Sequence, residues 1–509
     1  MTEMPSFENY IMLCNSTKIQ VVNLIPALQF KCKQALIIST SFAQAQGFTD
    51  RLIKVFNEHG VTSKIEKITD LEEKNLMILI NRLEQITPKH SPILWNISGG
   101  QKIPSAAMLI CFQKRISAGF DKDYVVYTEA SPPEIWYFGS DYESKKEKTS
   151  VFISLKEVLY LSGYETMGNE NKLYPSPTNE VKDKIDIGRK AFEYFKDNEL
   201  FREAFFNYMK PFKTNVNISR EIKELLKKIL NNIKPKLSDI HVSKIGYKDL
   251  ENKIDNIFSN LDKAKNKEEL KQLIKPLKII TKPSVLYEDY WNGIKNLIID
   301  DVLKKIEFNQ VRLIKADITQ ENKQQLIEQI ESIGGEVKQD DTGLFYKKHI
   351  LKFSSFKSNG ILFEWMVAAA ILGEIEKNKM VKNSISEVYH SVETKNLNSD
   401  KHDAEHDIVI VTKFGTLIII ELKTYEFSGD LAQAQEGLVY KKSGPYGKAM
   451  IVGPLFLNMI ERKENGQKIL PDYIDGLIKD QEEIAAQNGI EYYYLDQLPG
   501  VLREKLYIR

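Results

Sequence analysis

The chain has few cysteines, no long apolar run and almost no net charge. Its three cysteines, Cys14, Cys32 and Cys111, are isolated in apolar surroundings. That pattern argues against a disulfide framework or a thiolate zinc site and favours a reducing compartment. No stretch approaches the roughly 18 apolar residues that a membrane span requires, and the first residues lack a signal-peptide pattern. We therefore expect a soluble, cytoplasmic protein without membrane contact.

Charge and length limit the function and the number of domains. Lys+Arg number 71 against 70 Asp+Glu, so the net charge is only +1. Any attraction to nucleic acid must then come from local patches. A chain of 509 residues is too long for one core and suggests about three domains.

Residues 1–165 alternate between short β-branched runs and helix-period segments, which predicts a Rossmann-like, doubly wound parallel sheet of the α/β class. The expected strands are Tyr10–Leu13, Ala35–Ser39, Lys64–Ile68, Ile93–Ile97 and Tyr124–Tyr127. The expected helices are Phe48–His59, Leu71–Leu83 and Ile103–Ile116.

Residues 166–340 have a different composition, because strand patterns vanish and Lys, Glu and Asn separate the Leu and Ile repeats. One helix is expected after Ser219, with a continuous apolar face from Ile222 to Ile233, and another over Asn322–Ile333. We interpret this region as a helical connector or insertion. Contact between its lysines and nucleic acid is the alternative.

Residues 341–509 mix helices and strands again. The pattern predicts a helix over Ile361–Lys377, strands over Asp407–Thr412 and Thr416–Lys423, a helix over Leu431–Lys441 and a strand over Ala449–Val452. Glu364 falls within the apolar stripe of the first helix, where a carboxylate is costly unless it is paired or bound to a cation. A satisfied structural glutamate remains the simpler interpretation of Glu364 alone.

The segment 407–423, DIVIVTKFGTLIIIELK, is typical of a hairpin whose connection Lys413–Gly415 has glycine at the left-handed position. That register places Asp407 opposite Glu421, where like charges are destabilising. Facing carboxylates at the end of an apolar hairpin favour a divalent metal, Mg²⁺ or Mn²⁺, and Glu364 could complete its ligands. Lys423 projects from the same face as Glu421 and could orient a nucleophilic water or stabilise transition-state charge.

Glu405 is a weaker candidate on the same strand. The pairs His402-Asp403 and His406-Asp407 suggest a histidine–aspartate phosphohydrolase only superficially, because those enzymes carry their ligands on helices. A Ser/His/Asp hydrolase has no Gly-x-Ser-x-Gly motif here.

Glu364, Asp407 and Glu421-Leu422-Lys423 resemble the PD-(D/E)XK, or restriction-endonuclease-like, nuclease core. The resemblance implies that Asp407, Glu421 and Glu364 are metal ligands, and that Lys423 is the catalytic lysine. The proline that gives the motif its name is absent before Asp407.

In the front region, the segment ILWNISGGQKIPS is a strand, a glycine turn and a helix start. Free amides and the helix dipole favour an anion there, and Lys102 adds a charge. Polar residues also end the first two strands, so we expect one rim suited to bases and phosphates. The candidate ligand-binding residues are Asn15, Ser16, Thr17, Thr40, Ser41, Asn96, Ser98, Gly99, Gly100, Gln101 and Lys102. Simple packing of a glycine turn is the alternative.

The segments IMLCNST, ALIISTSF and WNISGGQK resemble the CRISPR-associated Rossmann fold, or CARF, domain. The family more often has threonine where this chain has Gln101, which leaves the ring size of the ligand open. Together with the nuclease core, the resemblance implies an ancillary nuclease of type III CRISPR antiviral defence. It implies a homodimer, activated by a cyclic oligoadenylate such as cyclic tetraadenylate, that cuts DNA or RNA. A regulator that binds nucleic acid without cutting and a repair nuclease are the alternatives.

Overall fold

The computed structural model separates into two compact units. One comprises Met1–Phe192 and Phe363–Arg509, and the other Glu193–Leu362. The described residues are 7–130, 133–209, 252, 256, 259–260, 310–315, 318–335, 337–340, 343–347, 361–399, 402–423, 437, 439–444, 447–454 and 481–506. None of the described helices combines the length and apolar character that a membrane-spanning segment requires.

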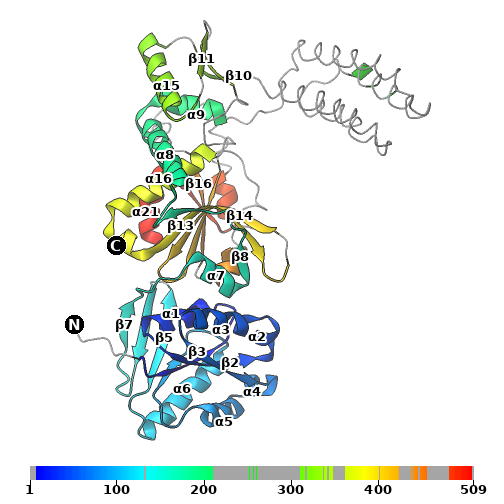
Figure 1. The fold of residues 1–509 in the computed structure, drawn as a ribbon, viewed down its shortest axis with the longest axis vertical. Helices are drawn as coiled ribbons and strands as arrows, with labels where there is room; N and C mark the ends of the chain where they lie inside the picture. Colours follow the sequence, from blue (N-terminus) through cyan, green and yellow to red (C-terminus); the bar gives the residue numbers. More distant parts are fainter. Residues whose placement is uncertain are drawn as a thin grey trace. The chain divides into compact units, whose positions relative to one another are not determined.

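The front sheet has seven strands in the order β3-β2-β1-β4-β5-β6-β7 (Figure 1). Strands β1 to β5 are parallel, and β6 and β7 are added antiparallel. This arrangement confirms a Rossmann-like α/β sheet, because buried β-branched runs alternate with helices that cover them. The strands are β1 (Ile11–Asn15), β2 (Gln34–Thr40), β3 (Thr62–Ile68), β4 (Ile93–Asn96), β5 (Tyr124–Ala130), β6 (Pro133–Phe138) and β7 (Lys145–Lys148).

The helices of the front part follow the expected order, with one correction. The helix expected over Leu71–Leu83 is wrong, since the chain forms two helices separated by Asn75. Asn75 has an extended backbone, and its side chain accepts a hydrogen bond from the N–H of Ile78, so it caps a new helix. The helices are α1 (Val21–Gln29), α2 (Ser41–Ala45), α3 (Phe48–Glu58), α4 (Asp70–Lys74), α5 (Leu76–Ile86), α6 (Lys102–Ser117) and α7 (Leu155–Ser162).

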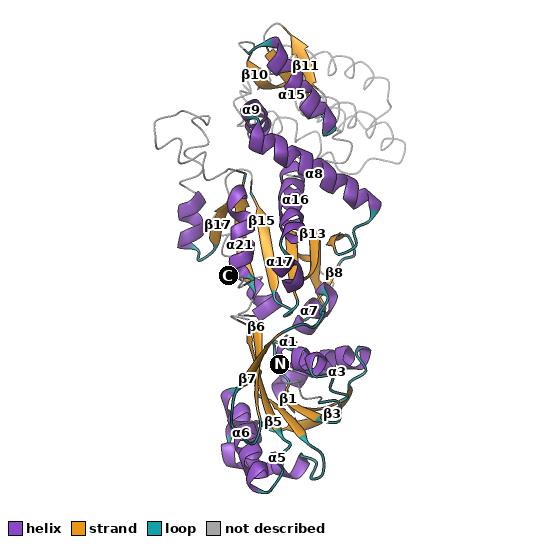
Figure 2. Cartoon of the chain, turned by 90° about the vertical axis from the view of Figure 1, so that its left-hand side faces the viewer, coloured by secondary structure: helices purple, strands orange, loops and turns teal. Residues whose placement is uncertain are grey.

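The back sheet has the order β17-β16-β15-β14-β13-β8, and β9 also pairs with β13. It is mixed: β13, β14 and β15 are antiparallel, and β16 and β17 continue parallel to β15. Its strands are β8 (Tyr164–Thr166), β9 (Asn171–Tyr174), β13 (Ile385–Asn396), β14 (His402–Thr412), β15 (Leu417–Leu422), β16 (Lys448–Gly453) and β17 (Glu491–Tyr494). Figure 2 shows this sheet with its helices α8 (Asn179–Asp197), α16 (Ile361–Lys377), α17 (Lys379–Ser384) and α21 (Leu498–Lys505).

The expected boundary at residue 165 differs from the structure, because it falls inside β8. Strand β8 crosses that boundary and β9 lies in the region expected to be a helical connector, yet both pair with β13 of the back sheet. These short segments carry little alternation of their own. Their pairing with a long central strand overrides weak local propensity.

The second unit is also not purely helical in its described part. It holds a three-stranded sheet in the order β10-β12-β11, together with the helices of that region. Its elements are α9 (Glu199–Met209), β10 (Gln310–Lys315), α15 (Gln320–Ser332), β11 (Val337–Asp340) and β12 (Gly343–Lys347). Helix α15 confirms the helix expected over Asn322–Ile333. The helix expected after Ser219 and most of the helix over Leu431–Lys441 lie outside the described residues.

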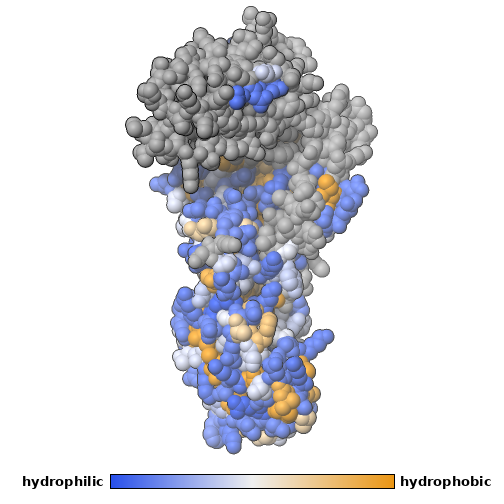
Figure 3. Space-filling model, turned by 90° about the vertical axis from the view of Figure 1, so that its right-hand side faces the viewer, coloured by the Kyte–Doolittle hydropathy of each residue, from blue (hydrophilic) through white to orange (hydrophobic). Residues whose placement is uncertain are grey.

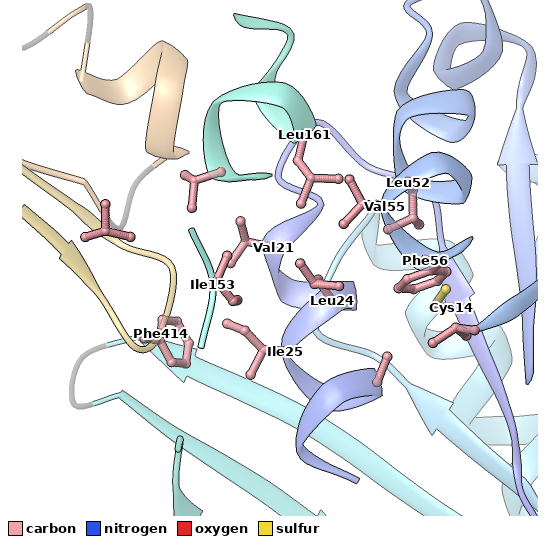
Figure 4. Close-up of a cluster of buried hydrophobic side chains, with 14 of the residues drawn as sticks. Cys14, Val21, Leu24, Ile25, Leu52, Val55, Phe56, Ile153, Leu161 and Phe414 are labelled. Atoms are coloured by element: carbon pink, nitrogen blue, oxygen red, sulfur yellow. The ribbon is translucent and has the colours of Figure 1, made fainter. Parts of the chain in front are cut away.

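The front and back sheets of the first unit share one hydrophobic core (Figure 4). Val21, Leu24 and Ile25 of α1 and Leu161 of α7 are buried in the same cluster as Phe414 of the β14–β15 turn. Burial of apolar area stabilises a fold by about 25 cal/mol per Å². The turn is therefore part of the packing of the front domain as well as of the back sheet.

Candidate functional site

The β14–β15 hairpin has the expected register. Ile408 pairs with Ile420 and Val411 with Leu417, and the N–H of Thr412 donates to the carbonyl of Thr416 at 3.0 Å. Gly415 has φ +70°, the left-handed backbone that the three-residue connection requires. Continued by one position, this register brings Asp407 opposite Glu421 at the end of the paired segment.

Asp407 is a half-buried carboxyl group with other acids nearby. Its Oδ2 accepts a hydrogen bond from the N–H of Leu422 at 2.7 Å. Burial, followed by the charges of Glu421 and Glu364, raises the pKa of Asp407 from 3.8 to about 8. The fold thus holds these carboxylates closer than their mutual repulsion favours.

Glu421 and Lys423 form an ion pair on the same face of β15. Glu421 is buried, and its burial raises the pKa of the carboxyl group even though Lys423 lowers it. The pKa of Lys423 is raised: burial lowers it, but the charge and hydrogen bond of Glu421 outweigh that cost. Lys423 therefore remains an ammonium group at neutral pH.

Glu364 lies near the start of α16 and has a hydrogen-bonded partner within the protein. Its Oε2 is 2.9 Å from Nε2 of His390 on β13. The His390 ring stacks on Trp365 with centroids 4.4 Å apart, and its Nδ1 lies 2.8 Å from the hydroxyl of Ser391. Glu364 acts electrostatically on Asp407 and Glu421, so it belongs to the same acidic site.

Among the residues that the structure describes, no group of three or more His, Cys, Asp or Glu side chains is arranged to hold a metal ion. Each of the three acids has a hydrogen-bond partner within the protein: Leu422 binds Asp407, Lys423 binds Glu421, and His390 binds Glu364. The donor set still fits a hard cation. Buried carboxylates that raise the pKa of one another accept a divalent ion readily, because the ion neutralises the charge that the fold leaves unbalanced.

The other acids and histidines of β14 lie in different surroundings. Glu405 is exposed and pairs with Glu393 across the strands. His402, Asp403 and His406 all lie on a strand, which excludes the helical ligand arrangement of a histidine–aspartate phosphohydrolase.

At the front sheet, the expected rim residues divide into two sets by burial. Asn15, Ser16 and Asn96 are buried, and their side chains form hydrogen bonds within the protein. They hold the strand ends together and do not face outward. The more accessible residues are Thr17, Thr40, Ser41, Ser98, Gly99, Gly100, Gln101 and Lys102.

The Gly99–Gly100 turn packs closely against the end of β1. A Cβ on Gly99 would lie 2.8 Å from Cγ2 of Thr17, and a Cβ on Gly100 would lie 2.9 Å from Cβ of Asn15. Gly100 also has φ +99°. Helix α6 begins directly after this turn at Lys102, which is exposed. The expected convergence of the β1 end with the glycine turn is thus confirmed.

Two buried amides of the front network were not among the candidate residues. Asn23 Nδ2 donates to the carbonyl of Asn15 at 2.8 Å, and Asn96 Nδ2 donates to Asn23 Oδ1 at 2.9 Å. Gln20 Nε2 donates to the Ser16 hydroxyl at 2.9 Å. A polar residue inside the apolar run VVNLIPAL is the signal that could have indicated Asn23.

One known family model matches the residues of the front sheet. Residues 11–157 match the family model described as the Card1 CARF domain. The front sheet is similar to a CARF domain. This match covers the segments on which the sequence resemblance rests, and it includes the strand ends and the glycine turn of the CARF-like domain. No curated protein matches the chain.

Solved structures resemble the chain over most of its length. Protein VC1899 from Vibrio cholerae aligns with a TM-score of 0.51 and 13% identity, covering 98% of this chain and 97% of that one. That likeness shows a shared fold. Can2 from Sulfobacillus thermosulfidooxidans, solved in complex with cyclic tetra-adenylate, aligns with a TM-score of 0.47 and 12% identity, covering 98% of each chain. A type III CRISPR defence DNA nuclease activated by cyclic oligoadenylate aligns with a TM-score of 0.37 and 9% identity, covering 89% of this chain and 46% of that one.

Proposed function

We propose that the protein is a nuclease of type III CRISPR defence that hydrolyses phosphodiester bonds in DNA or RNA, requires Mg²⁺ or Mn²⁺, and is activated by a cyclic oligoadenylate. One observation carries the catalytic half. Asp407, its pKa raised by burial and by neighbouring acids, faces Glu421 beside the ammonium group of Lys423. Placing these charges at the end of an apolar hairpin costs free energy of folding. A purely structural role does not explain that cost.

Each residue has a distinct role in this proposal. Asp407 and Glu421 would hold the metal, and Glu364 would complete its ligands directly or through water. When bound, a divalent ion polarises a phosphodiester oxygen and lowers the pKa of a water molecule. Lys423 remains protonated beside Glu421, so it is placed to orient the attacking water or to stabilise negative charge on the phosphate. His390 fixes the direction of the Glu364 carboxylate through its hydrogen bond.

The sensing half rests on the rim of the CARF-like domain. Buried amides hold the strand ends in place, and the glycine turn leaves its own backbone accessible beside Lys102. The amides of the glycine turn and a lysine at the start of a helix suit the phosphates of a cyclic oligoadenylate. The accessible residues Thr17 and Ser41 carry hydroxyls that could bind ribose or base edges, whereas the Ser98 hydroxyl donates to Asn96 Oδ1 and accepts from the N–H of Thr128.

We also propose a homodimer. The helices of the CARF-like domain expose large apolar side chains on an otherwise mostly hydrophilic surface (Figure 3). Exposed apolar groups that gather on one domain are typical of a contact surface. The exposed residues on these helices are Phe42, Leu71, Leu76, Met77, Ile78 and Leu109.

A cleavage assay tests the proposal. The protein is incubated with Mn²⁺ and either supercoiled plasmid or single-stranded RNA, with and without cyclic tetraadenylate. We expect cutting that depends on both the metal and the ligand. Cutting without the ligand would favour a repair nuclease, and ligand binding without any cutting would favour a regulator. Sedimentation of the protein at micromolar concentration tests the dimer.

A further inference from the structure

Helix α7 belongs to the CARF-like domain in sequence, but residues 387 and 442 of the back region hold it at its two ends. At its first residue, the N–H of Leu155 donates to Glu387 Oε2 at 2.7 Å, and Lys172 Nζ pairs with the other oxygen of Glu387 at 2.6 Å. At its last residue, the hydroxyl of Ser162 donates to the carbonyl of Lys442 at 2.6 Å. A carboxylate at a helix N-terminus is favoured by the helix dipole. Helix α7 is therefore fastened to the back sheet.

Lys442 is a buried lysine at the centre of this attachment, with an exposed fraction of 0%. Its Nζ lies 2.8 Å from Nε2 of His406 and 3.0 Å from Oδ2 of Asp403, both on β14. Its ammonium group also lies over the ring of Tyr164, 5.3 Å from the centroid, directly after α7 and Gly163. A buried ammonium group is retained only where partners compensate its lost hydration. His406 immediately precedes Asp407.

Helix α7 also packs against α3 of the CARF-like domain. Ser16, at the end of β1, accepts a hydrogen bond from Thr49 in the first turn of α3 at 2.9 Å. Leu52 and Val55 of the same helix α3 lie beside Leu161 of α7 (Figure 4). A displacement at the rim would therefore reach α7 through packed side chains, and α7 is fastened to Lys442.

We infer that Lys442 is a positioning residue that ties the last turn of α7 to β14, so that the state of the rim sets the position of Asp407. This inference rests on the proposed function for its biological meaning. The physical link itself does not depend on whether the protein cuts nucleic acid. Lys442 acts on Asp407 through His406 and Asp403, which lie on the same strand, β14.

Lys442→Met tests the link, because methionine retains much of the length but cannot bind His406 or Asp403. Lys441→Met is the matched control, since Lys441 is the exposed neighbour on the same helix. Hydrogen–deuterium exchange of the full chain without ligand is measured first. We expect Lys442→Met to accelerate exchange at least about tenfold both in the last turn of α7 and at the start of β14. Lys441→Met should change neither. Faster exchange confined to residues 439–444 would overturn the inference.

The second measurement uses cyclic tetraadenylate and Mn²⁺. Lys442→Met should lower ligand-stimulated cleavage about tenfold or more while ligand affinity, measured by calorimetry, stays at the wild-type value. A ligand-stimulated rate equal to wild type would contradict the inference. Should Lys442→Met fail to fold, Ser162→Ala removes only one hydrogen bond of the link and should move both readouts in the same direction by a smaller factor. If the wild type never cuts, the proposed function fails, and the exchange experiment still decides whether the link exists.

Discussion

The two candidate sites of the first unit differ in how their polar groups are satisfied. At the front rim, Asn15, Asn23 and Asn96 are buried neutral amides that bind one another or the backbone. At the back site, the half-buried Asp407 lies opposite the buried Glu421, and loss of hydration, followed by the charge of Glu421, raises the pKa of Asp407. The buried polar groups of the front site are neutral amides with hydrogen-bond partners, whereas the back site is electrostatically strained.

The difference indicates what each site can do. A preorganised neutral rim binds a ligand at a small entropic cost, because its own groups are already fixed. Acids held together against repulsion bind a cation strongly and concentrate charge where chemistry occurs. Substitutions that alter one site and leave the other intact can separate the two roles.

The largest effect is expected at the acids of the back site. Glu421→Gln removes a negative metal ligand and the partner of Lys423, so cleavage should fall by about 10³-fold or more. Affinity for cyclic tetraadenylate should be unchanged in calorimetry. Glu376→Gln, at an exposed acid of α16, is the control and should retain wild-type cleavage. A Glu421→Gln protein that still cuts would refute the catalytic assignment.

The reciprocal experiment concerns the front rim. Lys102→Ala removes the one lysine at the glycine turn, and the loss of a charge-assisted bond of about 1.5–3 kcal/mol should weaken ligand binding about tenfold to a hundredfold. Cleavage at saturating ligand should remain. Lys122→Ala serves as control, because this exposed lysine lies just before the N-terminal end of β5, away from the carboxyl ends of the strands where the rim lies. Unchanged affinity in Lys102→Ala would disprove the sensing site.

The close packing of the glycine turn predicts a difference between two glycines. Gly100 and Gly119 both have positive φ, +99° and +93°, but only Gly100 lacks room for a Cβ. Gly119→Ala should lower the free energy of unfolding by about 1 kcal/mol through backbone strain, and Gly100→Ala by about 2–3 kcal/mol. Denaturant unfolding measures both. Equal losses would mean that the turn does not pack against Asn15.

The smallest expected effect is a gain in stability at the strained site. In metal-free protein, Asp407→Asn keeps the acceptor for the N–H of Leu422 and removes a repelled charge, so it should stabilise the fold by about 1 kcal/mol at pH 8. A raised carboxyl pKa means that the folded wild type retains a proton that the unfolded chain has released. Wild-type stability therefore falls between pH 3.8 and about 8, and the advantage of the variant grows over that window. A variant less stable than wild type at pH 8 would show that Asp407 is not strained.

Some features of the front rim and of the back site could be predicted from the sequence, and others could not. The register of the β14–β15 hairpin followed from the glycine at position 415 and the period of two, which are local signals. That the strand ends of the front sheet meet at one rim was predicted from the alternation of strands and helices. His390, Glu387 and Lys442 were not predicted, because their partners lie 26, 232 and 36 residues away along the chain. Neither spacing nor composition encodes such long-range pairs. The split at Asn75 was missed because a helix-capping asparagine does not interrupt the apolar period.

The turn at residues 413–415 has a consequence for the history of the two domains. A Cβ on Gly415 would lie 2.7 Å from Cγ1 of Val21, and Phe414 is 3% exposed in the core beside α1. A CARF-like domain separated from the back sheet would expose that apolar surface to water and would be prone to aggregation. If recombination replaced the back domain, the new domain would need a turn that packs against α1 in the same way. We therefore expect the front and back domains to be inherited together and to diverge together.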